Sequence, residues 1–151
     1  MAASIEELSF EISAEAVAEQ ERTLSGLRTR AGTVVAAASI AGSFLGAAAS
    51  RGALDASAVL ALIAFTASLA SSIWILLPHE LVFAFRGDAL LAESGRREVE
   101  DVTEAYRALS GWLGPILDAN SRKISALSNW FTVSCILLAA EIILWTVSLA
   151  S

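Results

Sequence analysis

The uncharged stretch "ASAVLALIAFTASLASSIWILLP", residues 56–78, decides the fold class of this chain. It holds twenty-three residues between Asp55 and His79, and a helix of about 20 apolar residues crosses a hydrocarbon core about 30 Å thick. Ten of the twenty-three are Val, Ile, Leu or Phe, which are the residues that favour insertion into a bilayer. The stretch predicts a transmembrane helix over residues 56–78.

Two further stretches are long enough to cross a bilayer. Residues 31–50 are uncharged but hold only five Val, Ile, Leu or Phe, whereas residues 124–150 hold twelve and one charge, Glu141. The first of these is a marginal span alone and should need a helical partner. The whole chain is 56% hydrophobic and 17% charged, against about 25% charged in soluble domains. We therefore predict an all-α, polytopic membrane protein with three transmembrane helices rather than a soluble bundle.

The basic residues predict the orientation of these helices. Nine of the ten lie before residue 31 or between residues 79 and 123, and only Arg51 lies elsewhere. The positive-inside rule places such segments in the cytoplasm. The expected arrangement is a multi-pass protein of the plasma membrane, the inner membrane of a bacterial cell, with a cytoplasmic N-terminus and the C-terminus outside.

The cytoplasmic parts are also expected to be helical. Residues 1–30 read as a lead-in helix with an apolar stripe at Val17, Leu24 and Leu27. Within residues 79–123 the apolar spacing alternates between three and four, which is typical of a heptad seam. Either the lead-in helix or a second copy of the chain would cover this seam, and Gly114-Pro115 would end its helix. The seam residues are Val99, Val102, Tyr106, Leu109, Leu113 and Ile116.

The sequence contains few residues that could form a catalytic, metal or cofactor site. His79 is the only histidine and Cys135 the only cysteine, so a nucleophile paired with histidine or a multi-histidine metal site cannot form within one chain. None of the common catalytic, nucleotide or metal motifs is present. We expect no enzyme activity, no catalytic residue, no cofactor and no metal. The net charge of −6 argues against nucleic acid as a partner, because phosphate contacts need clustered Lys and Arg.

The carboxylate within the third span is the most informative single residue. Glu141 lies seven residues from both Ser134 and Ser148, so the three share one helix face. An acidic residue at mid-span costs about 3 kcal/mol on insertion scales, and it usually faces a bundle interior or a water-filled path. Two roles stay open: a packing stripe that bonds to Ser or Thr of another span, or a lining for a pore or proton path.

A stripe of small residues marks the first span. Ala38, Gly42, Gly46 and Ser50 follow one another at every fourth position, and small side chains let transmembrane helices approach closely. The second span carries a matching stripe of Ala64, Ser68 and Ser72, and the short connection predicts a hairpin of the two. The partner of Gly42 and Gly46 is therefore the second span or another copy.

Three stretches resemble a group of small, largely actinobacterial membrane proteins without assigned function: "LRTRAGTVVAAASIAGSFLG", "LLPHELVFAFRGDALL" and "SNWFTVSCILLAAEIILW". More distantly, the layout resembles the SLATT-type membrane effectors of bacterial conflict systems. The first resemblance implies three spans, and the second implies a pore-forming effector. The positions that the resemblance marks as characteristic are Arg28, Arg30, Phe85, Asp88, Glu141 and Trp145.

The leading functional expectation is an oligomeric, channel-like membrane effector. Copies would assemble through the heptad seam and the Gly42–Gly46 face, and the stripe containing Glu141 would line or gate a path. The alternative is a membrane-anchored scaffold or partner subunit that does not conduct ions. In that case Glu141 serves packing, and the cytoplasmic helices dock another protein. The expected partners are thus the lipid bilayer, further copies of the chain and a cytoplasmic protein.

Overall fold

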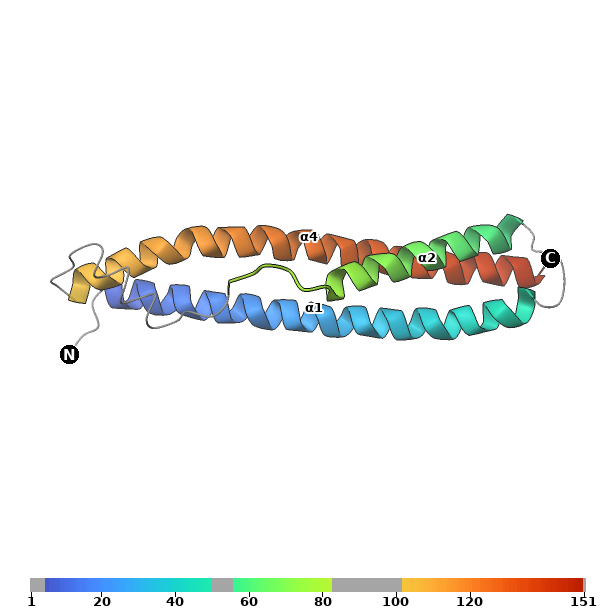
Figure 1. Cartoon of the computed structure of the whole chain (residues 1–151), viewed down its shortest axis with the longest axis horizontal. Helices are drawn as coiled ribbons and strands as arrows, with labels where there is room; N and C mark the ends of the chain where they lie inside the picture. The colour runs from blue at the N-terminus through green and yellow to red at the C-terminus, as the bar shows by residue number, and fades with distance from the viewer. Residues whose placement is uncertain (1–4, 50–55, 83–101, 151) are drawn as a thin grey trace. The chain divides into compact units, whose positions relative to one another are not determined.

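The computed structural model describes residues 5–49, 56–82 and 102–150, with side chains described except for residues 44–49 and 148–150. All regular structure in these ranges is α-helical, which confirms the all-α class (Figure 1). The three helices are α1 (Ile5–Ala49), α2 (Ala56–Leu76) and α4 (Val102–Ala150). Val99 of the predicted seam, together with Phe85 and Asp88, lies outside the described residues.

Two helices, α2 and α4, are long and apolar enough to cross a membrane. The prediction of three such spans holds only in part, because α1, whose side chains are described only as far as Ser43, is not among the helices that pass this test. Only 33% of the apolar window in α2 and 17% of that in α4 is buried within the chain. The core helix of a soluble protein would be buried on most sides, so this exposure favours a membrane location.

The chain divides into two compact units. The polar unit consists of Met1–Leu24 and His79–Ser125, and the apolar unit consists of Ser25–Pro78 and Ala126–Ser151. The helices α1 and α4 each contribute to both units, whereas α2 belongs to the apolar unit.

In the apolar unit α2 runs antiparallel to α1 and α4 (Figure 1). The buried side of α2 carries mainly small residues, which suits helices that pack in lipid without a hydrophobic driving force between them. Many large aliphatic side chains of α2 and α4 point outward, including Leu60, Ile63, Ile136 and Ile143. The buried residues are Leu27, Ala31, Val34 and Ala38 of α1; Ala58, Ala61, Ala64, Ser68, Ser71, Ser72 and Ile75 of α2; and Leu127, Ser134 and Glu141 of α4.

In the polar unit the first part of α1 packs along the first part of α4. Val17 and Leu24 of α1 are buried together with Leu113 of α4. The rings of Phe10 and Tyr106 lie 5.6 Å apart between centroids. These contacts run in the same order along both helices, so the two segments are parallel.

The helix α4 continues through Pro115, so the prediction that Gly114-Pro115 ends a helix is wrong. A proline inside a helix costs about 3 kcal/mol, because it donates no hydrogen bond and crowds the carbonyl four residues earlier. Here that carbonyl belongs to Gly111, which has no side chain of its own. Contacts to α1 on both sides of the proline offset the cost: Leu113 is buried, and the carbonyl oxygen of Leu117 accepts a 2.9 Å hydrogen bond from Gln20 Nε2.

The segment after Pro78 is held against α4 by side chains rather than by a helix. Asn120 is 3% exposed, and its Nδ2 donates to the carbonyl oxygen of Val82 at 2.8 Å. The backbone N–H of Val82 donates in return to Asn120 Oδ1 at 3.3 Å. Lys123 Nζ donates to the carbonyl oxygen of Glu80. The amide of Asn120 thereby replaces the backbone partner that an extended segment would otherwise need.

Candidate functional site

Three buried serines join α2 to α4 in the apolar unit. Ser68 and Ser72 come from successive turns of α2, and Ser134 comes from α4; none of the three is exposed. Ser68 Oγ donates to the carbonyl oxygen of Ser134 at 3.0 Å, and Ser134 Oγ donates to the carbonyl oxygen of Ser68 at 3.0 Å. Ser134 Oγ also lies 2.6 Å from Ser72 Oγ. We call these three residues the serine cluster.

The positions of the hydroxyl protons follow from counting donors. Each serine hydroxyl has one proton to donate. Ser68 and Ser134 use theirs on each other's backbone carbonyl oxygens, so Ser72 is the donor in its bond to Ser134. Every hydroxyl proton of the serine cluster is then bonded, and a fully bonded polar cluster fixes the rotation of two helices about their axes. The serine cluster therefore sets the register between α2 and α4.

Glu141 extends the buried face of α4 two turns beyond Ser134. It is 0% exposed, yet neither of its carboxyl oxygens has a hydrogen-bond partner among the described residues. One turn further, Trp145 Nε1 is also buried without a partner. The segments 31–50, 56–78 and 124–151 contain no Lys, Arg or His. These three segments thus provide no basic group to balance the carboxylate.

The register of the serine cluster identifies what lies beside Glu141. Glu141 lies seven residues after Ser134 in α4. Because α2 is antiparallel to α4, the level of Glu141 is reached in α2 about seven residues before Ser68, at Ala61. Ala61 and Ala64 are both buried. Two buried alanines of α2 thus come level with Glu141, and an isolated ionised group is costly in such an apolar interior. Of the predicted stripe, Ser134 and Glu141 share one buried face, and the side chain of Ser148 lies outside the described residues.

The small-residue stripe of α1 meets α2 of the same chain at one described point. Ala38 is fully buried, and a Cβ atom placed on Gly42 would lie 3.1 Å from Cε2 and Cζ of Phe65. That distance is shorter than an ordinary contact, so only glycine fits there without a shift of the ring. Gly46 belongs to α1, but its side-chain environment is not described. Ser50 lies outside the described residues.

The stripe of α2 that was expected to match the stripe of α1 includes Ser68 and Ser72. Both serines bond to Ser134 of α4, and Phe65 lies next to Gly42 instead. Phe65 precedes Ser68 by three residues and Ser72 by seven, so the three share one side of α2, and that side contacts both α1 and α4.

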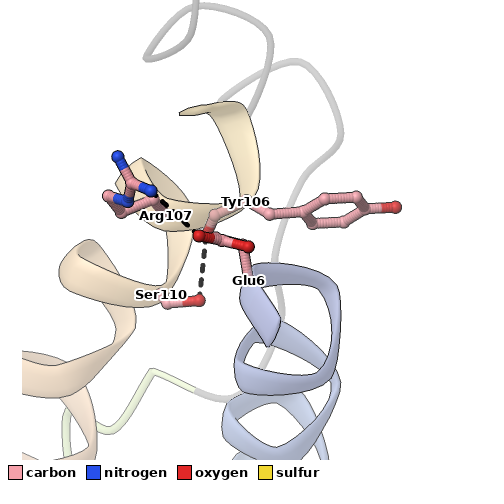
Figure 2. A network of polar contacts seen from close by, with 4 residues as sticks. All are labelled: Glu6, Tyr106, Arg107 and Ser110. Atoms are coloured by element: carbon pink, nitrogen blue, oxygen red, sulfur yellow. Dashed lines mark hydrogen bonds and ion pairs between the residues drawn. The ribbon is translucent and has the colours of Figure 1, made fainter. Parts of the chain in front are cut away.

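The heptad seam lies in the polar unit, where α1 covers part of it. Leu113 is 1% exposed, whereas Val102 is 69% exposed; Leu109 and Ile116 are partly buried. Figure 2 shows this contact near the N-terminal ends of α1 and α4. Arg107 Nη2 lies 2.9 Å from Glu6 Oε1. Within α4, Ser110 Oγ donates to the carbonyl oxygen of Tyr106 at 2.8 Å. The N-terminal helix of the same chain thus covers part of the seam.

Two features of the apolar unit were not predicted. Arg28 Nη2 donates to the carbonyl oxygen of Leu77 at 3.4 Å, just after the C-terminal end of α2. A cation there is stabilised by the partial negative charge of the helix end. In addition, outward-facing hydroxyls bond to the carbonyl four residues earlier, so that they need no partner outside the helix. Such residues are Thr33, Ser39 and Ser43 of α1, Thr66 of α2, and Thr132 and Thr146 of α4.

Within the part of the chain that the structure describes, no group of three or more His, Cys, Asp or Glu side chains could hold a metal ion. What the buried face of α4 offers is one carboxyl group and one indole N–H, both without partners. Comparison of the chain with protein-family models, with curated proteins and with solved structures finds no match.

Proposed function

We propose that this chain is a membrane-anchored scaffold or partner subunit, in which the apolar unit anchors the protein and the polar unit docks a cytoplasmic protein. The observation that carries this proposal is the full burial of Ser134 and Glu141 inside the helices of a single chain. Residues that line a pore between copies would have to face out of each chain. In this arrangement the stripe packs the bundle instead.

Three membrane crossings are part of the proposal. The segment of α1 from residue 31 onward buries Ala31, Val34 and Ala38 at spacings of three and four, and Gly42 contacts Phe65 of α2. A weakly apolar helix enters a bilayer when a stronger neighbour packs against it. The basic residues then place the N-terminus in the cytoplasm and the C-terminus outside.

A channel-like effector remains a second candidate because of one observation. Both carboxyl oxygens of Glu141 are buried without a partner among the described residues, and unpaired acidic groups inside membranes commonly mark ion or proton paths. Copies would then have to rearrange so that Glu141 reaches a shared lumen. The resemblance to SLATT-type effectors suggests the same function.

Ion flux separates the two candidates. The chain would be reconstituted into liposomes loaded with a potassium- or proton-sensitive dye, next to the variants Glu141→Gln and Glu104→Gln. Glu104 is an exposed residue of the polar unit and serves as the matched control. The scaffold proposal expects all three proteins to leave the vesicles tight. Flux that Glu141→Gln abolishes and Glu104→Gln leaves unchanged would instead establish the channel.

A further inference from the structure

The N-terminal part of α1 is apolar on two faces, and among the described residues only one of these faces is covered. Phe10, Val17 and Leu24 face α4. On the other side Ile5, Leu8 and Ile12 are 84%, 51% and 59% exposed. We call these last three residues the outer stripe. Large aliphatic side chains grouped on one exposed helix face are typical of an interaction site.

The spacing of the outer stripe makes it a helix-binding surface. Ile5, Leu8 and Ile12 are separated by three and four residues, so they lie on one side of the helix. The same side continues with Glu15 and Glu19, and Glu11 borders it; all three glutamates are exposed. Glu19 is 3.3 Å from Arg22, whereas Glu11 and Glu15 form no ion pair among the residues that the structure describes.

This charge pattern selects the partner. A second copy docked through the same face would bring its own glutamates close to these, and like charges at an interface repel. An anionic lipid surface is unfavourable for the same reason. An amphipathic helix with apolar residues on one side and Lys or Arg beside them complements both the outer stripe and the glutamates.

We propose that the outer stripe with Glu11 and Glu15 docks a basic amphipathic helix of another protein. This rests on the proposed scaffold function and specifies the partner by its chemistry. The apolar contact supplies the affinity, and the glutamates select positive charge and raise the association rate.

The test uses the full chain in zwitterionic nanodiscs and two synthetic helical peptides. Both peptides carry leucines at helical spacing on one face; one has lysines beside them, and the other has glutamates at the same positions. Fluorescence anisotropy of labelled peptide gives the affinity, with empty nanodiscs as the blank. The expected result is that the lysine peptide binds at least about tenfold more tightly than the glutamate peptide.

Variants assign the binding to this face. The double substitution Leu8→Ser/Ile12→Ser should lower the affinity for the lysine peptide at least about tenfold. The double substitution Glu11→Gln/Glu15→Gln should lower both this affinity and its salt dependence. The matched control Glu104→Gln should change neither. Because Leu8 and Ile12 are exposed, thermal melting followed by circular dichroism should stay unchanged in these variants.

Three results would overturn the inference. They are equal binding of the two peptides, unchanged binding in the Leu8→Ser/Ile12→Ser variant, or a concentration-dependent dimer that this variant abolishes, which would assign the face to a second copy. These results leave the scaffold proposal standing, since that depends on tight vesicles. Conversely, ion flux that depends on Glu141 would refute the scaffold while leaving the peptide result valid.

Discussion

The serine cluster predicts a measurable coupling between α2 and α4. Ser134→Ala removes a hydroxyl that donates to the carbonyl oxygen of Ser68 and accepts from Ser72. Such bonds between transmembrane helices contribute about 0.6 kcal/mol each on average. The loss of two predicts a decrease in the free energy of unfolding of about 1 kcal/mol.

The response of Ser72 limits how large the decrease can become. A buried hydroxyl left without a partner costs about 1–3 kcal/mol. Here, however, the carbonyl oxygen of Ser68 lies four residues before Ser72 and loses its bond from Ser134 in the variant. Ser72 can turn its hydroxyl to that oxygen, as many helical serines do. The expected value therefore stays near 1 kcal/mol.

The assay is reversible unfolding in mixed detergent micelles, followed by circular dichroism, in a double-mutant cycle with Ser72→Ala. The coupling energy between the two substitutions should be about 0.6 kcal/mol. The control is Ser39→Ala, because the exposed Ser39 hydroxyl bonds only to Val35 of its own helix at 2.8 Å; it should change stability by less than about 0.5 kcal/mol. Additive substitutions, or equal effects of Ser134→Ala and Ser39→Ala, would refute the proposed cluster.

Three further substitutions probe other contacts by the same unfolding assay. Gly42→Leu should destabilise the bundle by about 1–3 kcal/mol, since even a Cβ there lies 3.1 Å from the facing ring. Gly32→Leu is the control, because a Cβ there meets nothing within 4 Å; it should leave the free energy of unfolding unchanged or raise it by up to about 1 kcal/mol. Equal destabilisation by Gly42→Leu and Gly32→Leu would contradict the described contact. Glu141→Leu should raise stability by about 1–3 kcal/mol because it removes an unpartnered buried acid, while Glu104→Leu should change it by less than about 0.5 kcal/mol; a clear loss at Glu141 would mean that the carboxyl group has a partner. Asn120→Ala should lower stability by about 1–3 kcal/mol, since it leaves two backbone groups unpaired, and proteolysis should become faster next to Pro78; unchanged cleavage would argue against the paired segment.

The sequence was sufficient for the parts of the fold that depend on composition. The uncharged run of residues 56–78 predicted α2, and the apolar stripe at Val17, Leu24 and Leu27 predicted a face that is indeed buried. Glu141 could also be singled out, because an acidic residue is conspicuous in an apolar helix. These features need only the hydropathy and the period of one helix at a time.

Features that depend on which helices are neighbours could not be predicted in this way. Ser68 belongs equally well to a stripe facing α1 or to one facing α4, and only the packed bundle assigns it to Ser134. Pro115 illustrates the same limit, because the local rule for proline was outweighed by contacts on both sides of it. The spacing of Ile5, Leu8 and Ile12 places them on one side of a helix, but spacing does not reveal which face of a helix stays uncovered.

In the proposed arrangement with three spans, the hydroxyl bonds within α1 bear on how this helix would enter a bilayer. Hydropathy values count Thr33, Ser39 and Ser43 as polar, yet each hydroxyl proton is already bonded to a carbonyl of its own helix. Those bonds exist only after the helix has formed, since they need a carbonyl one turn earlier. An unfolded segment would carry the full dehydration cost of the same groups. Insertion of α1 should therefore require that the helix forms first, before its transfer into lipid.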